Sequence, residues 1–145
     1  MQITEKILLL ITAAITTIAA LFCVISLSTP GWAAIGSIGL FCRGCPSAPA
    51  GLSIVAFILL IIAIVVLILF VLNVIPKLLR SVAFGILFLA TIFTLSAYTS
   101  VVDPAVGYSF KLMVTAHFFS YVASFFTAFW LGGSYATRVV APDNS

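Results

Sequence analysis

Few residues of this chain could carry chemistry, and the most reactive of them form a short cysteine motif. Cys42 and Cys45 are separated by two residues. A CxxC pair outside the cytosol is either a structural disulfide or a redox-active pair. A structural bond would close only a small loop, so it would add modest stability and mainly fix the turn that presents Leu40 and Phe41.

The redox interpretation needs a second pair of cysteines. Membrane oxidoreductases that pass electrons from a CxxC motif to a quinone use such a pair to exchange with their substrate protein. The only other cysteine here is Cys23, which falls in a long apolar stretch and is predicted to lie inside a helix, out of reach. A thiol oxidoreductase is therefore the least favoured alternative, and we expect that the protein is not an enzyme.

A single histidine, His117, lies within another apolar stretch, six residues or roughly 9 Å along a helix from Lys111. An ionisable residue inside a membrane suggests a functional role by default. Antiparallel packing would place His117 near the level of Thr94 or Tyr98. Since no Asp, Glu, Cys or second His accompanies it at that depth, we expect a neutral, hydrogen-bonded packing histidine, with no metal or cofactor.

The composition excludes most other classes of function. The 145 residues are 64% hydrophobic and include only six Lys or Arg and three Asp or Glu. A soluble domain carries about a quarter of its residues as charges, so this surface would be too apolar for water. The sequence shows no glycine-rich phosphate loop, no paired carboxylates and no basic cluster that would bind nucleic acid.

The charges fall between four long apolar blocks, each close to the roughly 20 residues that a helix needs to cross a bilayer. These blocks predict an all-α membrane protein with a single domain over residues 1–145. The predicted helices cover about residues 7–27, 52–75, 82–102 and 109–133, and the longest connection, residues 28–51, is predicted to be extracellular. Because the other connections are short, we expect an antiparallel bundle of four helices.

The positions of the basic residues predict the orientation of the bundle. Four of the six lie at the N-terminus, in the second connection and in the tail: Lys6, Lys77, Arg80 and Arg138. Only Arg43 and Lys111 fall on the other side. Basic residues accumulate on the cytoplasmic side, so both termini are predicted to be cytoplasmic.

The fourth helix carries two patterns that suit helix–helix contact. Small residues recur at every fourth position: Ala116, Ser120, Ser124 and Ala128. Aromatic residues run beside them: Phe118, Phe125 and Phe129. Small residues allow membrane helices to approach closely, so we expect the first and fourth helices to pack together through this ridge. The alternative is that the ridge and the aromatic residues form a face for another membrane protein.

The connection after the first helix resembles the first extracellular loop of the claudin and peripheral-myelin-protein superfamily. Trp32 follows the helix, and Gly39-Leu40-Phe41 then leads directly into the two cysteines. In the family this loop carries a Trp, then Gly-Leu-Trp, then two cysteines that form a disulfide. The resemblance implies a Cys42–Cys45 bond and a cluster of Trp32, Gly39, Leu40 and Phe41 that anchors the loop.

The loop also departs from the family pattern. Phe41 stands where the family has a tryptophan, and the two cysteines are closer together. The loop is too short to supply the small β-sheet that covers the membrane surface in the family. The surfaces with which claudins seal the space between cells have no counterpart here.

Members of this superfamily act as junction proteins, as myelin proteins or as auxiliary subunits of ion channels and receptors. The short loop argues against a seal between cells. The resemblance therefore implies a non-enzymatic, claudin-like tetraspan of the plasma membrane that modulates a channel or receptor complex. Its expected partners are the lipid bilayer and another integral membrane protein, or a second copy of itself, and not nucleic acid. The alternative is a structural or adhesive protein at cell–cell contacts.

Overall fold

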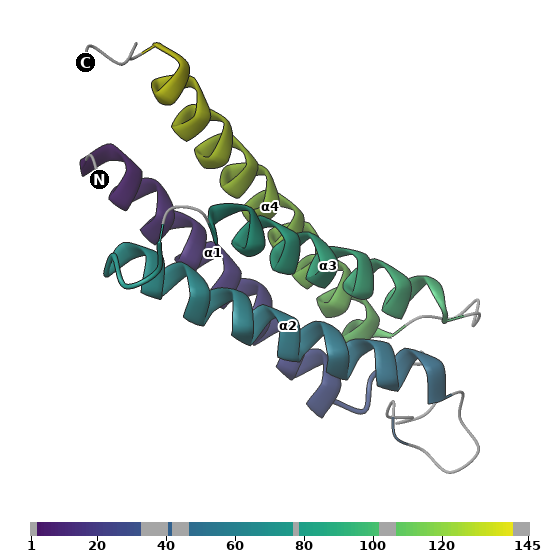
Figure 1. Ribbon diagram of the computed structural model, residues 1–145. Helices are drawn as coiled ribbons and strands as arrows, with labels where there is room; N and C mark the ends of the chain where they lie inside the picture. Colours follow the sequence, from purple (N-terminus) through teal and green to yellow (C-terminus); the bar gives the residue numbers. More distant parts are fainter. Residues whose placement is uncertain (1–2, 33–40, 42–46, 77–78, 102–106, 141–145) are drawn as a thin grey trace.

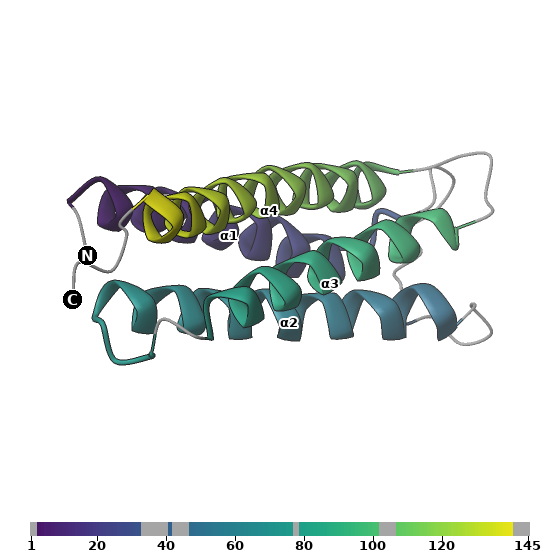
Figure 2. The same cartoon turned by 45° about the horizontal axis from the view of Figure 1, so that its top comes forward.

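The computed structural model describes residues 3–32, 41, 47–76, 79–101 and 107–140, with only the backbone for residues 134–140. Within these ranges the chain forms four α-helices and no strand. The helices are α1 (Ile3–Ser28), α2 (Ser47–Val71), α3 (Arg80–Thr99) and α4 (Tyr108–Val140). Sequential helices run antiparallel, as Figures 1 and 2 show.

The helices form a closed ring in which each one packs against two neighbours. Helix α1 contacts α2 and α4, and α3 contacts the same two helices from the other side. Both termini lie at one end of the bundle together with the α2–α3 connection, and we call this the N/C end (Figure 1). The last turns of α1 and α3 and the first turns of α2 and α4 lie at the opposite end, which we call the loop end.

All four helices are long and apolar enough to cross a membrane. The spans are the whole of α1, α2 and α3, of 26, 25 and 20 residues, and the first 26 residues of α4, Tyr108–Gly133. A helix of 20 residues covers roughly 30 Å, the thickness of the hydrocarbon layer. The predicted all-α architecture with four membrane helices is confirmed, and the protein is a multi-pass membrane protein.

Helix α2 ends four residues before its predicted end at Ile75, because the chain forms a Schellman motif there. Asn73 adopts the left-handed conformation with φ of 56°. Its N–H donates to the carbonyl of Phe70 (3.0 Å), and the N–H of Val74 donates to that of Leu69 (3.1 Å). These two bonds define the motif, and asparagine is the residue that most often replaces glycine in it. The apolar sequence continues past this point, so hydropathy alone misses the stop.

The other end of α2 begins earlier than predicted, at Ser47 instead of Leu52. Pro49 falls in the first turn, where its missing N–H has no helical partner to lose. The predicted starts of α1, α3 and α4 differ from the observed ones by at most four residues. The predicted end of α3 differs by three residues, whereas α4 continues past its predicted end to Val140. Pro49 is typical of turns, so the sequence predicts a connection where the first turn of α2 lies.

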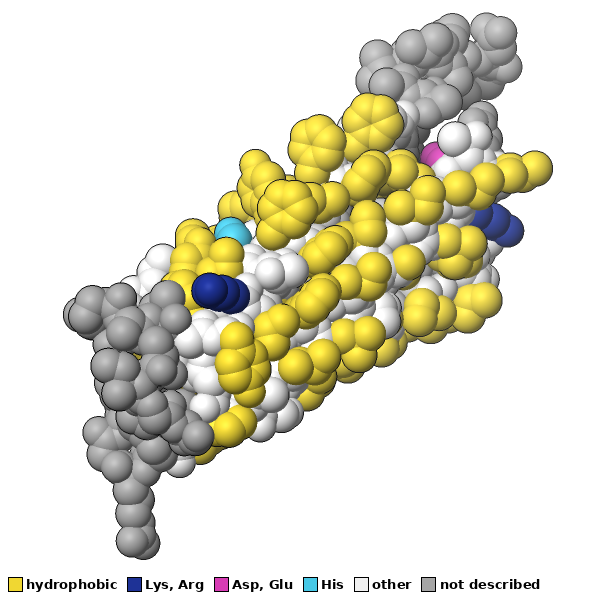
Figure 3. Space-filling view, turned by 180° about the vertical axis from the view of Figure 1, so that it is seen from behind, with side chains coloured by type: hydrophobic (Ala, Val, Ile, Leu, Met, Phe, Trp, Pro, Cys, Tyr) yellow, Lys and Arg dark blue, Asp and Glu magenta, His cyan; other side chains and the backbone are white. Residues whose placement is uncertain are grey.

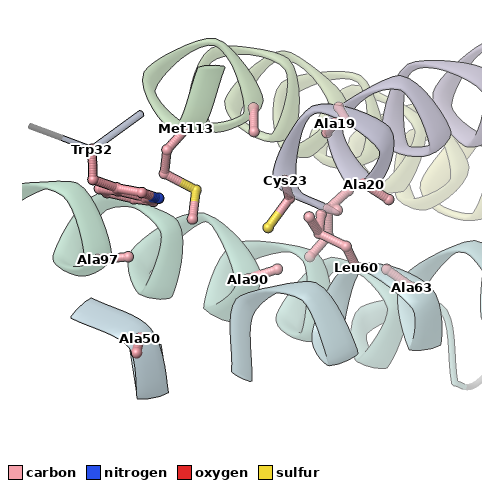
Figure 4. Close-up of a cluster of buried hydrophobic side chains, with 13 residues drawn as sticks. Ala19, Ala20, Cys23, Trp32, Ala50, Leu60, Ala63, Ala90, Ala97 and Met113 are labelled. Carbon is pink, nitrogen blue, oxygen red and sulfur yellow. The ribbon is translucent and has the colours of Figure 1, made fainter. Parts of the chain in front are cut away.

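Small side chains fill the interior of the bundle. Figure 4 shows alanines of several helices turned toward one another around Cys23, Leu60 and Met113. Large apolar side chains such as Ile58 and Phe88 lie on the outer surface instead, where each is about half exposed. Lipid provides no hydrophobic drive for helices to associate, so close packing of small residues must hold them together.

Buried hydroxyl groups in the interior bond to their own helices. The Thr16 hydroxyl donates to the carbonyl of Thr12, that of Ser53 to Pro49, and that of Thr91 to Leu87, at 2.7–2.9 Å. Each bond spans one helical turn. Because the hydroxyls satisfy themselves in this way, serine and threonine act in this interior as small packing residues.

A larger side chain in the interior should destabilise the bundle. Ala90 of α3 is fully buried, and replacing it with leucine should overpack the core and lower the stability of the bundle by about 1–3 kcal/mol. Thermal unfolding in mild detergent, followed by circular dichroism, measures this loss. Ala14 of α1 faces outward, so Ala14→Leu is the matched control. Equal melting of the two variants would contradict close packing at Ala90.

Candidate functional site

At the loop end, Ser109 ties the end of α1 to the start of α4. The backbone N–H of Ser109 donates to the carbonyl of Gly31 (3.0 Å), and the N–H of Gly31 donates to the Ser109 hydroxyl (3.1 Å). The Ser26 hydroxyl donates to the Ser109 carbonyl (2.7 Å), and the Thr29 and Ser109 hydroxyls lie 2.7 Å apart. Ser109 is fully buried, so these bonds are not exchanged with water.

Trp32 covers the interior of the bundle at the loop end, close to the hydrogen bonds of Ser109. Its indole N–H donates to the carbonyl of Ser26 (2.9 Å), and its ring meets that of Phe110 edge to face, with centroids 6.5 Å apart. Figure 4 shows Trp32 beside Met113 and Ala97. The side chain is buried, so Trp32 is held by the bundle and does not project from the connection that follows α1.

The other members of the predicted loop cluster are only partly described. Phe41 is exposed, with 64% of its surface accessible. Gly39, Leu40, Cys42 and Cys45 lie outside the described residues, so the predicted disulfide stays a prediction. Cys23 is buried within α1, as predicted, with its thiol 3.9 Å from the carbonyl of Ser53.

At the N/C end, a charged residue from α3 links the helices. Arg80 is buried, and a terminal nitrogen of its guanidinium lies 3.8 Å from a carboxylate oxygen of Glu5 on α1. Its guanidinium carbon lies 4.9 Å from the centre of the Trp130 ring on α4, and Trp130 meets Phe70 of α2 at 5.6 Å. One cation thus contacts an acidic group and an aromatic face, and residues from all four helices meet there.

Sequence reasoning treated Arg80 only as a residue that sets orientation, and it did not single out Trp130. The signal that could have revealed this cluster is the pairing of the only acidic residue of α1, Glu5, with a basic residue at the predicted start of α3. Both positions fall at the same end of an antiparallel bundle.

The small-residue ridge of α4 follows the buried side of the helix over three of its four positions. Ala116, Ser120 and Ser124 are buried, whereas Ala128 is exposed. Residues four apart drift by about 40° around a helix, so the fourth member turns outward and Thr127 takes the buried position. Ser124 of this ridge contacts Thr91 of α3, with their hydroxyl oxygens 3.0 Å apart.

His117 lies at the boundary between α3 and α4, at the level that antiparallel packing predicts. Its Nδ1 is 3.2 Å from the Thr94 hydroxyl oxygen, and its ring is 5.4 Å from that of Tyr98. The Thr94 hydroxyl donates to the Thr91 carbonyl (2.8 Å), and its oxygen accepts from His117 Nδ1 in the tautomer that carries the proton on that nitrogen. The predicted hydrogen-bonded histidine is confirmed, and in this tautomer Nε2 is an acceptor.

The aromatic side chains predicted for α4 stand on its outer surface. Phe118, Phe125 and Phe129 have 60–69% of their surfaces accessible. We call these three residues the aromatic face. Phe118 lies about 100° around the helix from both Phe119, which stacks on Phe22 of α1 at 5.8 Å, and His117, which contacts α3, so the aromatic face points away from both neighbouring helices. The structure thus separates the buried ridge from the exposed aromatic residues on one helix.

Among the described residues, no three His, Cys, Asp or Glu side chains lie close enough together to hold a metal ion. Polar side chains meet between helices at the Ser109 tie, in the Arg80 cluster and in the Thr94–His117 and Thr91–Ser124 pairs.

No protein-family model, no curated protein and no solved structure matches this chain. Its class is therefore defined by fold and composition: a tetraspan membrane protein with four apolar helices in an antiparallel bundle.

Removal of the Ser109 hydroxyl should weaken the loop end. Ser109→Ala leaves the buried N–H of Gly31 without its acceptor, and a buried unsatisfied donor costs about 1–3 kcal/mol. We expect that much loss of stability in a thermal unfolding experiment. Ser28→Ala is the matched control, because the Ser28 hydroxyl is exposed and bonds only within α1. Equal stability of both variants would show that the tie is dispensable.

Loss of the Arg80 charge should weaken the N/C end. Arg80→Met keeps the length of the side chain but removes the cation from Trp130 and from Glu5, and we expect a loss of about 1–2 kcal/mol. The emission of Trp130 should shift, whereas Lys6→Met, at an exposed position, should change neither quantity. Unaltered unfolding and emission in Arg80→Met would rule out the contact.

Proposed function

We propose that this protein is a non-enzymatic, claudin-like tetraspan of the plasma membrane that acts through lateral contacts with another integral membrane protein. The role that we infer is that of an auxiliary subunit that modulates a channel or receptor complex. The aromatic face of α4 carries this proposal, because three phenylalanines stand on one side of a single helix with most of their surface uncovered.

The aromatic face has the chemistry of a protein contact. Large, rigid rings supply much contact area for little loss of conformational freedom, and aromatic residues dominate the binding energy of many interfaces. Most of the outer surface of α2, in contrast, consists of aliphatic residues such as Ile58, Ile62 and Val65. A surface of that kind suits lipid, whereas the aromatic face suits a second helix.

The proposed orientation places both termini in the cytoplasm. Lys6 and Arg80 lie at the N/C end, and the last turn of α4 at the same end contains Arg138. Lys111 lies near the loop end, one turn inside α4. The excess of basic residues at the N/C end supports this orientation by the positive-inside rule. The connection between α1 and α2 is then extracellular, as in the claudin superfamily.

Kinship with the claudin superfamily is part of the proposal. It is supported by the antiparallel bundle of four helices and by Trp32, which follows α1 at the loop end as the resemblance implies. A second candidate function, adhesion at cell–cell contacts, is favoured by Phe41, because this large apolar side chain is exposed in the connection after α1. An apolar side chain in that position can contact a protein on a neighbouring cell.

Affinity purification of the full chain tests the proposed function. The tagged protein is recovered from its native membrane in gentle detergent, and co-purifying proteins are quantified by mass spectrometry. We expect a channel or receptor subunit in stoichiometric amount, and Phe118→Ala with Phe129→Ala should reduce its recovery by about tenfold, because truncated aromatic anchors are costly at an interface.

The matched control changes the lipid-facing side of α2. Ile58→Ala with Val65→Ala removes exposed apolar side chains of comparable accessibility and should leave recovery unchanged. Recovery of junctional proteins alone would support adhesion instead. Equal loss of the subunit in both double variants would show that the aromatic face has no special role.

A further inference from the structure

Beside the aromatic face, α4 exposes a second strip that adjoins α3. This strip consists of His117, Tyr121 and Ala128, and we call it the polar edge. His117 is half-buried against α3, whereas Tyr121 and Ala128 are exposed. Successive members are four and seven residues apart, so all three lie within about 40° of one another around the helix. Figure 3 shows the histidine, in cyan, at the surface among protruding hydrophobic side chains.

The polar edge carries one group that can donate a hydrogen bond and one that can accept it. In the tautomer with its proton on Nδ1, the nitrogen that faces Thr94, His117 offers Nε2 as an acceptor. The Tyr121 hydroxyl has no hydrogen bond in the described residues, and 61% of the residue is accessible. The two groups belong to the same helix but do not bond to each other.

The depth of Tyr121 makes this arrangement costly in a monomer. The α4 span runs from Tyr108 to Gly133, so Tyr121 lies at its middle. Tyrosines favour the membrane surface, and the headgroups are about 15 Å away at this level, too far for the side chain to reach. A hydroxyl without a partner in hydrocarbon is unfavourable, so the site requires a protein partner.

We propose that a second copy of this chain docks on the polar edge, so that Tyr121 of each copy donates a hydrogen bond to His117 Nε2 of the other. This inference goes beyond the proposed function, because it uses the polar edge on the α3 side of α4 and not the three phenylalanines of the aromatic face.

A second copy fits because the polar edge is complementary to itself. Two copies inserted in the same orientation and related by a twofold axis along the membrane normal bring identical residues to the same depth. Tyrosine side chains in a helix lean toward its N-terminus, so the Tyr121 hydroxyl reaches toward the level of His117, about 6 Å away along the axis. Both bonds then form at once.

Ala128 supports the same contact. This small residue is exposed and lies about two helical turns from Tyr121 along the polar edge, toward the N/C end. Small residues let the backbones of two membrane helices approach closely. A bulky side chain at this position would hold a second α4 away.

Energy transfer between labelled full-length chains tests the dimer. Donor and acceptor fluorescent proteins are fused to the C-terminus, and the chains are reconstituted in palmitoyl-oleoyl phosphatidylcholine vesicles at increasing lipid-to-protein ratio. We expect the transfer to fall on dilution as for a monomer–dimer equilibrium. Tyr121→Phe removes both symmetric bonds and should weaken association roughly tenfold. Tyr108→Phe, at another exposed tyrosine of α4, is the matched control and should behave as the wild type.

A double-mutant cycle identifies the bonded pair. His117→Asn retains an N–H that can reach Thr94 but lacks the Nε2 acceptor, so it should also weaken association roughly tenfold. The double variant with Tyr121→Phe should be no weaker than either single one, because all three lose the same bonds.

Three results would overturn the proposal: no transfer above that of a monomeric membrane protein, wild-type association in Tyr121→Phe, or additive losses in the double variant. The vesicles contain no other protein, so each result concerns the dimer alone. Recovery of a channel or receptor subunit tests the proposed function separately.

Discussion

The close approach of four helices in a solvent that does not push them together is the constraint on which this structure depends. In lipid, two apolar surfaces gain little by leaving the hydrocarbon, so helices associate through tight packing and a few polar contacts. The interior meets this demand with small side chains such as Ala63, Ala90 and Ser120 packed around a few large ones such as Leu60 and Met113. Many other large apolar side chains lie on the outer surface, where they can contact lipid or a partner.

Polar contacts then fix the two ends of the bundle and leave the middle to packing. Ser109 joins α1 to α4 at the loop end by reciprocal bonds with Gly31, and Arg80 joins the helices at the N/C end through Glu5 and Trp130. Between these ends, buried hydroxyls such as those of Thr16 and Ser53 bond to carbonyls of their own helices. The Thr91–Ser124 and Thr94–His117 contacts join α3 to α4.

Sequence reasoning predicts the coarse architecture well, because the length of an apolar block and the cost of an unsatisfied backbone in lipid leave few alternatives. It also predicts the level of His117, which follows from antiparallel pairing. It cannot predict the stop at Asn73, since a left-handed residue is invisible to hydropathy. Nor can it divide one helix into a buried ridge and two exposed strips, because the outward turn of Ala128 depends on which side of α4 the neighbours occupy.

The length of α4 has a mechanical consequence. Its 33 residues make a continuously hydrogen-bonded rod of roughly 50 Å. The rod is held near one tip by Ser109 and, ten residues before Val140, by the contacts of Trp130 with Arg80 and Phe70. Helix α4 can thus transmit a displacement at the loop end to the Arg80 cluster at the N/C end as one rigid body.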